Sequence, residues 1–202
     1  MNFPKTAGQC KYVLALRSNK PIIIGTGPAG TGKTMLACNI ATEHILKHPR
    51  ARVVLTRPIV AADEDMGYLP GDMDQKMEPW TRPMYDIFEQ SMTHNQMDRC
   101  ICIEPLGYMR GRTFNHTLII ADEMQNSTPN QMKLLLTRLG EGTKIIVTGD
   151  LEQSDLEGNN GLENLVYKMQ CMELDYIQHV EMGDDDIVRH PAVKEVLGIL
   201  SK

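Results

Sequence analysis

A glycine-rich segment between residues 27 and 34 has the residue types and the spacing of a phosphate-binding loop. It reads Gly-Pro-Ala-Gly-Thr-Gly-Lys-Thr and fits the pattern G-x-x-x-x-G-K-[ST], in which glycines let backbone N–H groups turn inward around phosphate oxygens. Lys33 would reach the β- and γ-phosphates of a nucleotide, and the Thr34 hydroxyl would join the coordination shell of Mg²⁺. The residues expected to bind the nucleotide are Gly27, Pro28, Ala29, Gly30, Thr31, Gly32, Lys33 and Thr34.

The sequence on both sides of this loop supports the match. A glycine-rich turn would fit the pattern by chance in on the order of one chain in a hundred of this length, given ordinary residue usage. Here an apolar run, Ile22–Gly25, precedes the loop and a helical pattern, Lys33–Leu46, follows it. Phosphates would then lie at the positive end of that helix. This context favours a nucleotide site over an accidental turn.

The second chemical feature is an acidic pair, Asp122-Glu123, which directly follows the apolar run Leu118–Ala121. A strand there would bring Asp122 to its carboxyl end to hold a Mg²⁺-bound water, and Glu123 would orient and deprotonate the attacking water. Taken alone, such a pair is more often a helix N-cap. After a phosphate-binding loop it is the expected partner, so we predict metal binding by Thr34 and Asp122 and catalysis by Glu123.

A third strand pattern, Lys144–Thr148, ends in the polar residues Gly149-Asp150-Leu-Glu-Gln153. Gln153 could contact the γ-phosphate and report its loss. A strand-to-helix turn rich in glycine and aspartate explains the same residues equally well. From the residues alone, both interpretations of Gln153 stand.

The elements that must position these residues alternate between β-branched runs and helical patterns, which is typical of a parallel α/β sheet flanked by helices. The predicted strands are Ile22–Gly25, Val53–Thr56, Ile101–Glu104, Leu118–Asp122, Lys144–Thr148 and Tyr176–Glu181, and the predicted helices are Lys33–Leu46, Pro129–Leu139, Gly161–Met169 and Pro191–Leu200. At least one strand, and by the pattern two, separates the loop-bearing strand from the strand before Asp122. That spacing indicates a nucleoside triphosphatase with an inserted strand and a catalytic glutamate, rather than a kinase or a small GTPase.

The stretch Arg57–Arg99 interrupts this alternation. We interpret it as an insertion, at about residues 57–99, that contains a short helix near Met84–Ser91. Long insertions in compact domains are more often functional than idle. The remaining elements are enough for one core, so we expect residues 1–202 to form a single domain.

Composition narrows the class of protein. Of the 202 residues, 42% are hydrophobic and 23% are charged, as in ordinary globular proteins. Without an apolar run of about 20 residues or an apolar N-terminal stretch, we expect a cytoplasmic protein (in the host cytoplasm if it is viral) with no membrane partner. The net charge of −5 argues against a protein that mainly coats nucleic acid, although a local basic groove remains compatible with it.

Seven sequence blocks, in order along nearly the whole chain, are similar to those of the PhoH family of phosphate-starvation-inducible ATPases. They are Gly27–Thr34, Thr56–Pro58, Gly67–Asp72, Tyr108–Thr113, Asp122–Asn126, Thr137–Gly140 and Val188–Pro191. The chain resembles the short, single-domain versions carried by bacteria and their viruses. Met124 departs from the pattern, because relatives often have alanine there, and a methionine beside a catalytic glutamate should be tolerated.

The resemblance implies a RecA-like P-loop NTPase fold, similar to the first motor domain of superfamily-one helicases, with ATP and Mg²⁺ as ligands. It implies that Gln125 couples hydrolysis to movement and that Gln153 is the γ-phosphate contact. It also implies that Gln9 reads the adenine base, whereas the residue by itself favours a plain surface glutamine.

Two functions from different classes stay open. The first is an ATPase that depends on nucleic acid, with single-stranded RNA as the favoured ligand. The second is an ATP-switched assembly protein that binds no nucleic acid. The helicase-like blocks favour the first function, and the acidic net charge favours the second.

Two-domain motors take an arginine finger from their second domain, and a chain of this length has room for one motor domain only. We therefore expect a ring-shaped homo-oligomer, a hexamer as the resemblance suggests, in which a neighbouring copy supplies the arginine. The unassigned arginines in the family-like blocks are Arg110, Arg112, Arg138 and Arg189, of which Arg112 and Arg189 are the predicted fingers. For Arg189, a salt bridge to the acidic run Asp184–Asp186 is an alternative of equal weight.

Overall fold

The computed structural model describes residues 4–48, 50–58, 73–156, 158, 160–189, 192, 193, 196 and 199, and for residues 73–80 it describes the backbone alone. The family-like block Gly67–Asp72 lies outside the described residues. So does most of the helix expected at Pro191–Leu200. Of the insertion at about 57–99, residues 59–72 are likewise outside the described part.

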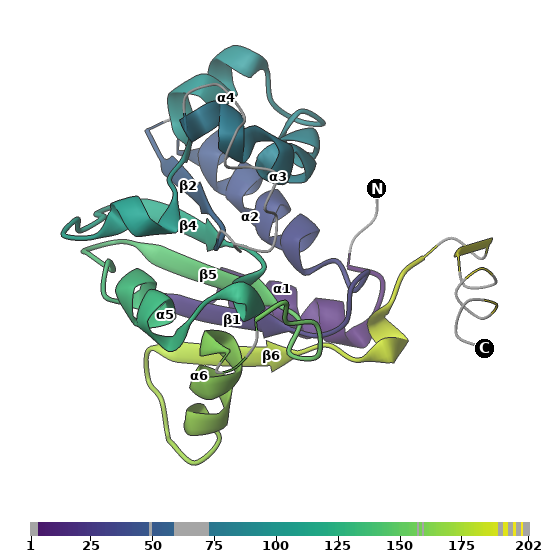
Figure 1. Ribbon diagram of the computed structural model, residues 1–202. Coiled ribbons are helices and arrows are strands. Elements are labelled where there is room, and N and C mark those ends of the chain that lie inside the picture. The colour runs from purple at the N-terminus through teal and green to yellow at the C-terminus, as the bar shows by residue number, and fades with distance from the viewer. Residues whose placement is uncertain are drawn as a thin grey trace.

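Six parallel strands form one sheet, in the order β3-β2-β4-β5-β1-β6 (Figure 1). Their bounds are β1 Ile22–Thr26, β2 Arg52–Thr56, β3 Ile101–Ile103, β4 Thr117–Ala121, β5 Lys144–Gly149 and β6 Ile177–Glu181. Along the chain β2 and β3 separate β1 from β4, as predicted, and in the sheet β5 lies between β1 and β4. Because the strands are parallel, their carboxyl ends meet at one edge of the sheet.

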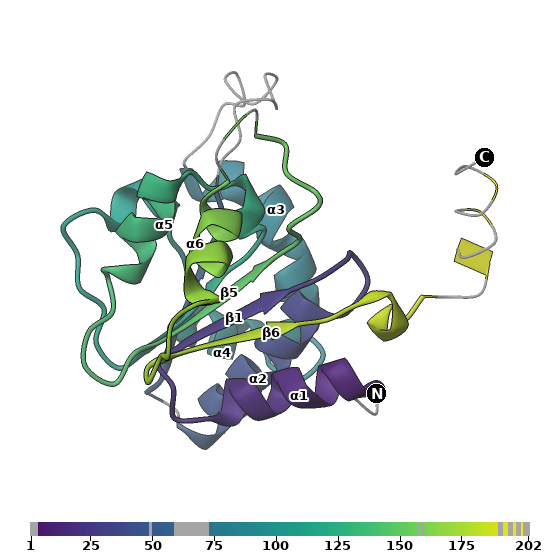
Figure 2. The ribbon, with the colours of Figure 1, turned by 90° about the horizontal axis from the view of Figure 1, so that it is seen from below.

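Helices cover both faces of this sheet (Figure 2). On one face lie α1 (Ala7–Arg17), α2 (Lys33–Lys47), α3 (Met73–Phe88) and α4 (His94–Cys100). On the other face lie the 3-10 helix η2 (Leu106–Met109), α5 (Pro129–Leu136) and α6 (Gly161–Met169). Two further 3-10 helices, η3 (Met124–Asn126) and η4 (Asp184–Asp186), follow β4 and β6.

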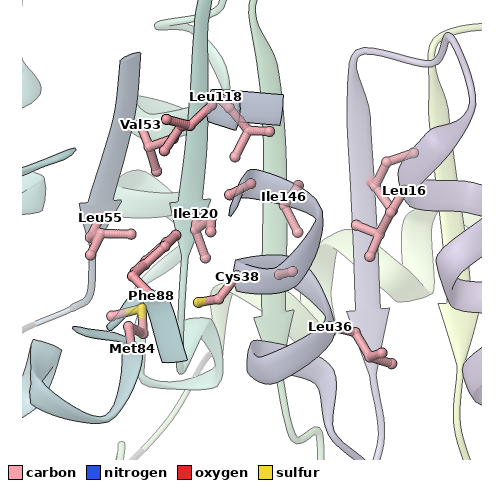
Figure 3. Packing of buried hydrophobic residues seen from close by; sticks show 14 of the residues in the cluster. Leu16, Leu36, Cys38, Val53, Leu55, Met84, Phe88, Leu118, Ile120 and Ile146 are labelled. Atoms are coloured by element: carbon pink, nitrogen blue, oxygen red, sulfur yellow. The ribbon is translucent and has the colours of Figure 1, made fainter. Parts of the chain in front are cut away.

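Strand β4 shows why the sheet has a core on each face. Leu118 and Ile120 pack into the core beneath α2, whereas Ile119 and Ala121 pack into the core beneath α5 and α6. Successive side chains of a strand point to opposite faces, so a strand covered on both faces is apolar throughout. Figure 3 shows the first of these cores, to which α3 contributes Phe88.

The predicted strands agree with the observed ones to within one residue at each end, and the predicted helix Gly161–Met169 agrees with α6. The prediction Pro129–Leu139 is too long, since α5 ends at Leu136. Leu139 instead forms a parallel bridge with Phe114, and the Phe114 N–H donates to the carbonyl oxygen of Arg138. This pairing draws the chain out of the helix.

Three helical features differ from the predictions. The short helix near Met84–Ser91 is wrong in its bounds, because α3 runs from Met73 to Phe88. Helix α4 and helix α1 are absent from the predicted set. Helix α1 begins after Thr6, whose hydroxyl caps it by accepting from the Gln9 N–H, and it brings Gln9 toward the carboxyl edge of the sheet.

Candidate nucleotide-binding site

The carboxyl edge of the sheet brings together three segments that are far apart in the sequence. Strand β1 leads into the glycine-rich loop, β4 leads into Asp122 and Glu123, and β5 leads into Asp150. Ligands of open parallel sheets bind outside the carboxyl ends of the strands. The predicted phosphate-binding loop, Asp122 and Glu123 therefore lie at the edge where such ligands bind.

Three glycines shape the loop after β1, with φ of +139° at Gly27, +90° at Gly30 and +84° at Gly32. Residues with a side chain rarely adopt these backbone angles. Helix α2 begins at Lys33, directly after Gly32. Within the described part of the chain, the N–H groups of Gly30 and Gly32 have no hydrogen-bond acceptor, so they are available to an anion at the start of the helix.

The Lys33 ammonium donates to carbonyl oxygens of its own loop, over 2.6 Å to Gly27 and 2.9 Å to Pro28. Burial lowers the pKa of this ammonium, and the nearby carboxylates, Asp150 before Glu123, oppose that shift. Phosphate oxygens are stronger acceptors for an ammonium than neutral carbonyls are. A bound triphosphate would therefore draw Lys33 from these carbonyls and offset the cost of its burial.

Thr34 and Asp122 meet although they come from the ends of different strands. The Thr34 hydroxyl donates to Oδ1 of Asp122 over 2.7 Å, and the buried Thr148 hydroxyl of β5 donates to the same oxygen. Thr148 was not among the predicted site residues, and the polar end of its strand was the signal that could have identified it. Its hydrogen bond fixes the Asp122 carboxylate toward α2.

The oxygen atoms at this position fit Mg²⁺, which prefers hydroxyl, carboxylate and phosphate ligands and keeps several waters. Thr34 and Asp122 are the residues that would hold it. A bound Mg²⁺ would neutralise charge on the β- and γ-phosphates.

Glu123 has a backbone conformation that is rare for residues with a side chain, with φ of +53° and ψ of +40°. Its carboxylate accepts a hydrogen bond from Nε2 of Gln125 over 2.5 Å. The Gln125 carboxamide is buried, and its Oε1 accepts from the Asp150 N–H over 3.1 Å. Backbone strain of this kind persists where the surroundings hold it, and it is frequent at functional sites.

Gln9 is fully buried, so the interpretation of this residue as a plain surface glutamine is wrong. Its Nε2 donates to the carbonyl oxygen of Thr31 over 3.0 Å, and its Oε1 accepts from the Lys5 N–H over 2.8 Å. The carboxamide thus contacts the glycine-rich loop from the N-terminal end of α1.

Two other predicted residues lie apart from this cluster. Gln153 is exposed on the loop after β5, and no hydrogen bond among the described residues joins its side chain to the glycine-rich loop or to Glu123. Arg112 forms an ion pair with Glu104 over 2.5 Å, and its guanidinium lies 4.7 Å from the ring centre of Phe114.

Arg189 contacts the glycine-rich loop of its own chain. Its Nη2 donates to the carbonyl oxygen of Ala29 over 2.7 Å. The alternative ion pair with Asp184–Asp186 is not found among the ion pairs of the described residues. Sequence reasoning did not place Arg189 here, because the hydrogen bond joins residues at opposite ends of the chain.

The family model for PhoH-like proteins matches residues 3–201. The chain belongs to the PhoH family. A PhoH-like protein of Bacillus subtilis (strain 168) is 44% identical over 204 residues, which cover 98% of this chain and 63% of that protein. Protein PhoH of Escherichia coli (strain K12) is 38% identical over 202 residues, which cover 96% of this chain and 56% of that protein. The chain therefore spans less than two-thirds of the length of either PhoH relative.

Solved structures resemble this PhoH-family chain at much lower identity. The large terminase of a thermophilic bacteriophage aligns with 99% of the chain and 51% of its own, at 14% identity and a TM-score of 0.55. The two proteins share the fold of a parallel sheet flanked by helices. Among the helices of the described residues, none is both long enough and apolar enough to cross a bilayer.

Proposed function

We propose that the protein binds and hydrolyses ATP with Mg²⁺. We further propose that single-stranded nucleic acid, with RNA as the favoured ligand, stimulates ATP turnover. The observation that carries this proposal is the 2.7 Å hydrogen bond between Thr34 and Asp122 beside the buried Lys33. A hydroxyl after the loop lysine and a carboxylate at the end of a neighbouring strand are the groups that a Mg-nucleotide site requires.

The proposed chemistry follows from the positions of these groups. Loop N–H groups and Lys33 bind the phosphates, and Glu123 orients a water molecule in line with the γ-phosphorus. The bond from the water oxygen to the phosphorus forms as the bond to the ADP oxygen breaks, and the Glu123 carboxylate takes the water proton. Gln125 holds that carboxylate from the side of β5.

Two further roles belong to the proposal. Gln153 would contact the γ-phosphate when the loop after β5 meets the bound nucleotide. Gln9 would read the adenine base, for which its carboxamide must exchange its present partners, the Thr31 carbonyl and the Lys5 N–H. Both roles require a rearrangement on binding, which is common in sites that close around a substrate.

The proposed assembly is a ring-shaped homo-oligomer, a hexamer, that acts in the cytoplasm. A neighbouring copy would supply Arg112, which would exchange Glu104 for the γ-phosphate of the next subunit. In well-studied cases such an arginine raises the rate by about 10³–10⁵. Mixing Arg112→Ala with Glu123→Gln protein should restore activity, because an intact finger then meets an intact Glu123. A protein that is monomeric by light scattering in the presence of Mg·ATP, and that has full specific ATPase activity, would exclude the ring.

The alternative is an ATP-switched assembly protein that binds no nucleic acid, which the net charge of −5 favours. Steady-state ATPase rates with and without single-stranded RNA, at low and moderate salt, separate the two functions. A rate that RNA raises at both salt concentrations supports the nucleic-acid-dependent ATPase. A rate that RNA leaves unchanged, with ATP altering the oligomeric state, supports the alternative.

Two variants test the nucleotide chemistry itself. Lys33→Ala should lose tight nucleotide binding, because the charge that meets the β- and γ-phosphates is removed. Glu123→Gln should bind Mg·ATP but hydrolyse it at least about 100-fold more slowly. Glu163→Gln, the same substitution on the exposed surface of α6, is the matched control and should behave as wild type. Wild-type turnover by Glu123→Gln would remove this residue from the role of base.

A further inference from the structure

Residues Met182–Arg189, which follow β6, run along the glycine-rich loop and α1, and we call them the C-terminal strap. The strap begins as an extension of the sheet, because the Met182 N–H donates to the carbonyl oxygen of Thr26 over 2.8 Å. Farther on, the Val188 N–H donates to the carbonyl oxygen of Gly30 over 3.1 Å. In Figure 2 the strap leaves β6 close to the N-terminal end of α1.

The strap approaches the backbone of the loop and of α1 at three glycines, and there is no room for a side chain at these positions. A Cβ atom on Gly27 would collide with the carbonyl oxygen of Met182, and one on Gly8 would collide with the Asp186 carboxylate. A Cβ atom on Gly30 would lie 2.7 Å from Nε of Arg189. Gly27 and Gly30 therefore accommodate the strap on the outer side of the loop as well as the phosphates on its inner side.

The strap and α1 also take up carbonyl groups that the loop turns outward. The strap donates to the carbonyl oxygens of Ala29 and Gly30, and Gln9 donates to that of Thr31. Thr31 is buried, whereas Ala29 and Gly30 are exposed, and all three carbonyls have hydrogen-bond donors other than Lys33. When Lys33 turns to the phosphates, the outer side of the loop stays held.

The strap is fixed to α1 by Asp186. This carboxylate is largely buried and accepts from the N–H groups of Gly8 and Gly183, each over 3.0 Å. It lies at the start of α1, where a negative charge is favourable. The residue after Gly8 in α1 is Gln9, which contacts the loop. The strap and α1 therefore both hold the glycine-rich loop.

We propose that the C-terminal strap holds the glycine-rich loop of its own chain in the shape that binds phosphate, and that Arg189 is a positioning residue for that loop. The Arg189 guanidinium fixes the Ala29 carbonyl outward, so that the next N–H group along the loop, that of Gly30, faces the opposite side. This role rests on the proposed function, because phosphate of the bound ATP is the loop's ligand. In this proposal Arg189 acts on the loop of its own chain, instead of serving as the predicted finger of a neighbouring subunit.

The first test measures the loop in the protein without nucleotide. Hydrogen exchange of a peptide that covers residues 27–34 should be faster in Arg189→Ala and in Asp186→Asn than in wild type. Exchange in α5 and α6 should stay unchanged, which a general loss of stability would not allow. Arg17→Ala is the matched control, since it removes an exposed arginine whose partner, Glu43, lies away from the loop. Unchanged exchange at residues 27–34 in both strap variants overturns the proposal.

The second test measures binding of a fluorescent ADP analogue. Arg189→Ala removes the hydrogen bond that holds the loop, so a smaller fraction of the free protein has the phosphate-binding shape and the Kd should rise about tenfold. Arg189→Lys, which keeps the charge but not the planar fork, should lie between this variant and wild type. An unchanged Kd in Arg189→Ala contradicts the positioning role. If wild type does not bind the analogue, the proposed function fails, while the exchange experiment still decides whether the strap holds the loop.

The third test separates a role in the same chain from a role in a neighbour. Arg189→Ala and Glu123→Gln proteins are mixed, and ATPase activity is measured across mixing ratios. In our proposal the first chain has a displaced loop and the second has no base, so no active site is restored. Recovery of activity in the mixture would show that Arg189 acts on a neighbouring site, and the proposal would fail.

Discussion

Nε2 of Gln125 donates to Oε2 of Glu123 over 2.5 Å, while Oε1 of the same carboxamide accepts from the Asp150 N–H over 3.1 Å. One buried side chain therefore links the residue after β4 to the residue after β5. The hydrogen bond from Gln125 restricts the direction of the Glu123 carboxylate. Gln125 is thus placed to control the geometry of the proposed base.

Gln125→Ala should lower kcat by about ten- to a hundredfold, because a small displacement of the base is costly in an aligned site. The Kd for ADP should remain close to that of wild type, since the hydrogen bonds described for the Gln125 side chain go to Glu123 and Asp150 and not to the glycine-rich loop. Single-turnover kinetics and equilibrium binding measure the two quantities. A wild-type kcat would show that Glu123 keeps its direction without this hydrogen bond.

Gln153→Ala tests the proposed contact with the γ-phosphate. It should weaken binding of a non-hydrolysable ATP analogue and leave the Kd for ADP unchanged, because ADP lacks the γ-phosphate. The expected loss is about tenfold, the size of one hydrogen bond to a charged group. Equal Kd values for the ATP analogue in variant and wild type would mean that Gln153 stays on the surface, where it lies here.

Gln9→Ala and Gln9→Glu separate two roles of this carboxamide. If Gln9 reads adenine, both variants should lose the preference for ATP over GTP, since a mismatched base edge leaves polar groups unpaired. If it acts only on the Thr31 carbonyl, both nucleotides should bind more weakly and the preference should stay. The ratio of kcat/KM for ATP and GTP distinguishes the outcomes. Equal use of both nucleotides by wild type would exclude base reading.

Asp186 should make the strap sensitive to acid. A hydrogen bond from the Thr6 hydroxyl, together with those from the Gly183 and Gly8 N–H groups and the charge of Lys11, holds the pKa of Asp186 below its usual range. A lowered pKa stabilises the folded state above the ordinary pKa of aspartate, about 4, and that contribution is lost as the pH falls through the folded pKa.

The measurement is the free energy of unfolding of wild type minus that of Asp186→Asn, as a function of pH. This difference should be constant between about pH 7 and pH 5 and should shrink in more acidic solution. Other carboxyl groups are common to both proteins and cancel. A difference that grows as the pH falls would mean that folding raises the pKa of Asp186, which would contradict the assigned hydrogen bonds.

Tyr12→Phe should leave the free energy of unfolding unchanged or raise it by up to about 1 kcal/mol. The Tyr12 hydroxyl is buried and has no hydrogen-bond partner among the described residues, and burial raises the pKa of this group. Its ring packs against Gly25 of β1 and is needed there, so Tyr12→Ala should cost about 3–5 kcal/mol. Chemical denaturation measures both. A clear loss of stability in Tyr12→Phe would reveal a partner for the hydroxyl.

The parts of the fold that could be predicted from the sequence are those in which a short pattern carries the information. The six strands are continuous apolar runs because both of their faces are covered, as in β4. The glycine-rich loop is identified by its spacing, since few other residues tolerate the backbone angles of Gly27, Gly30 and Gly32. Once the loop is identified, the acidic pair at the end of β4 can be assigned, because nucleotide hydrolysis needs carboxylates as well as a phosphate-binding loop.

The remaining features depend on contacts between distant parts of the chain. Asp184–Asp186 lie next to Arg189 in the sequence and suggest an ion pair, yet the partner of Arg189 is the Ala29 carbonyl. Helix α1 mixes small, polar and apolar residues, and only the packed structure shows that Gln9 is buried against Thr31. Helix α4 is short and mostly polar, so its pattern is weak.

The close approach of Met182 to Gly27 also has a consequence for the order of folding. The glycine-rich loop is synthesised early, but the C-terminal strap that packs against its outer side is among the last segments of the described chain to leave the ribosome. Strand β1 likewise waits for β5 and β6, which flank it in the sheet. Such long-range parallel pairings form slowly. A nascent chain that lacks β6 and the strap carries the whole glycine-rich sequence without the contacts that we propose hold its shape, so it should bind nucleotide more weakly until residue 189 has emerged.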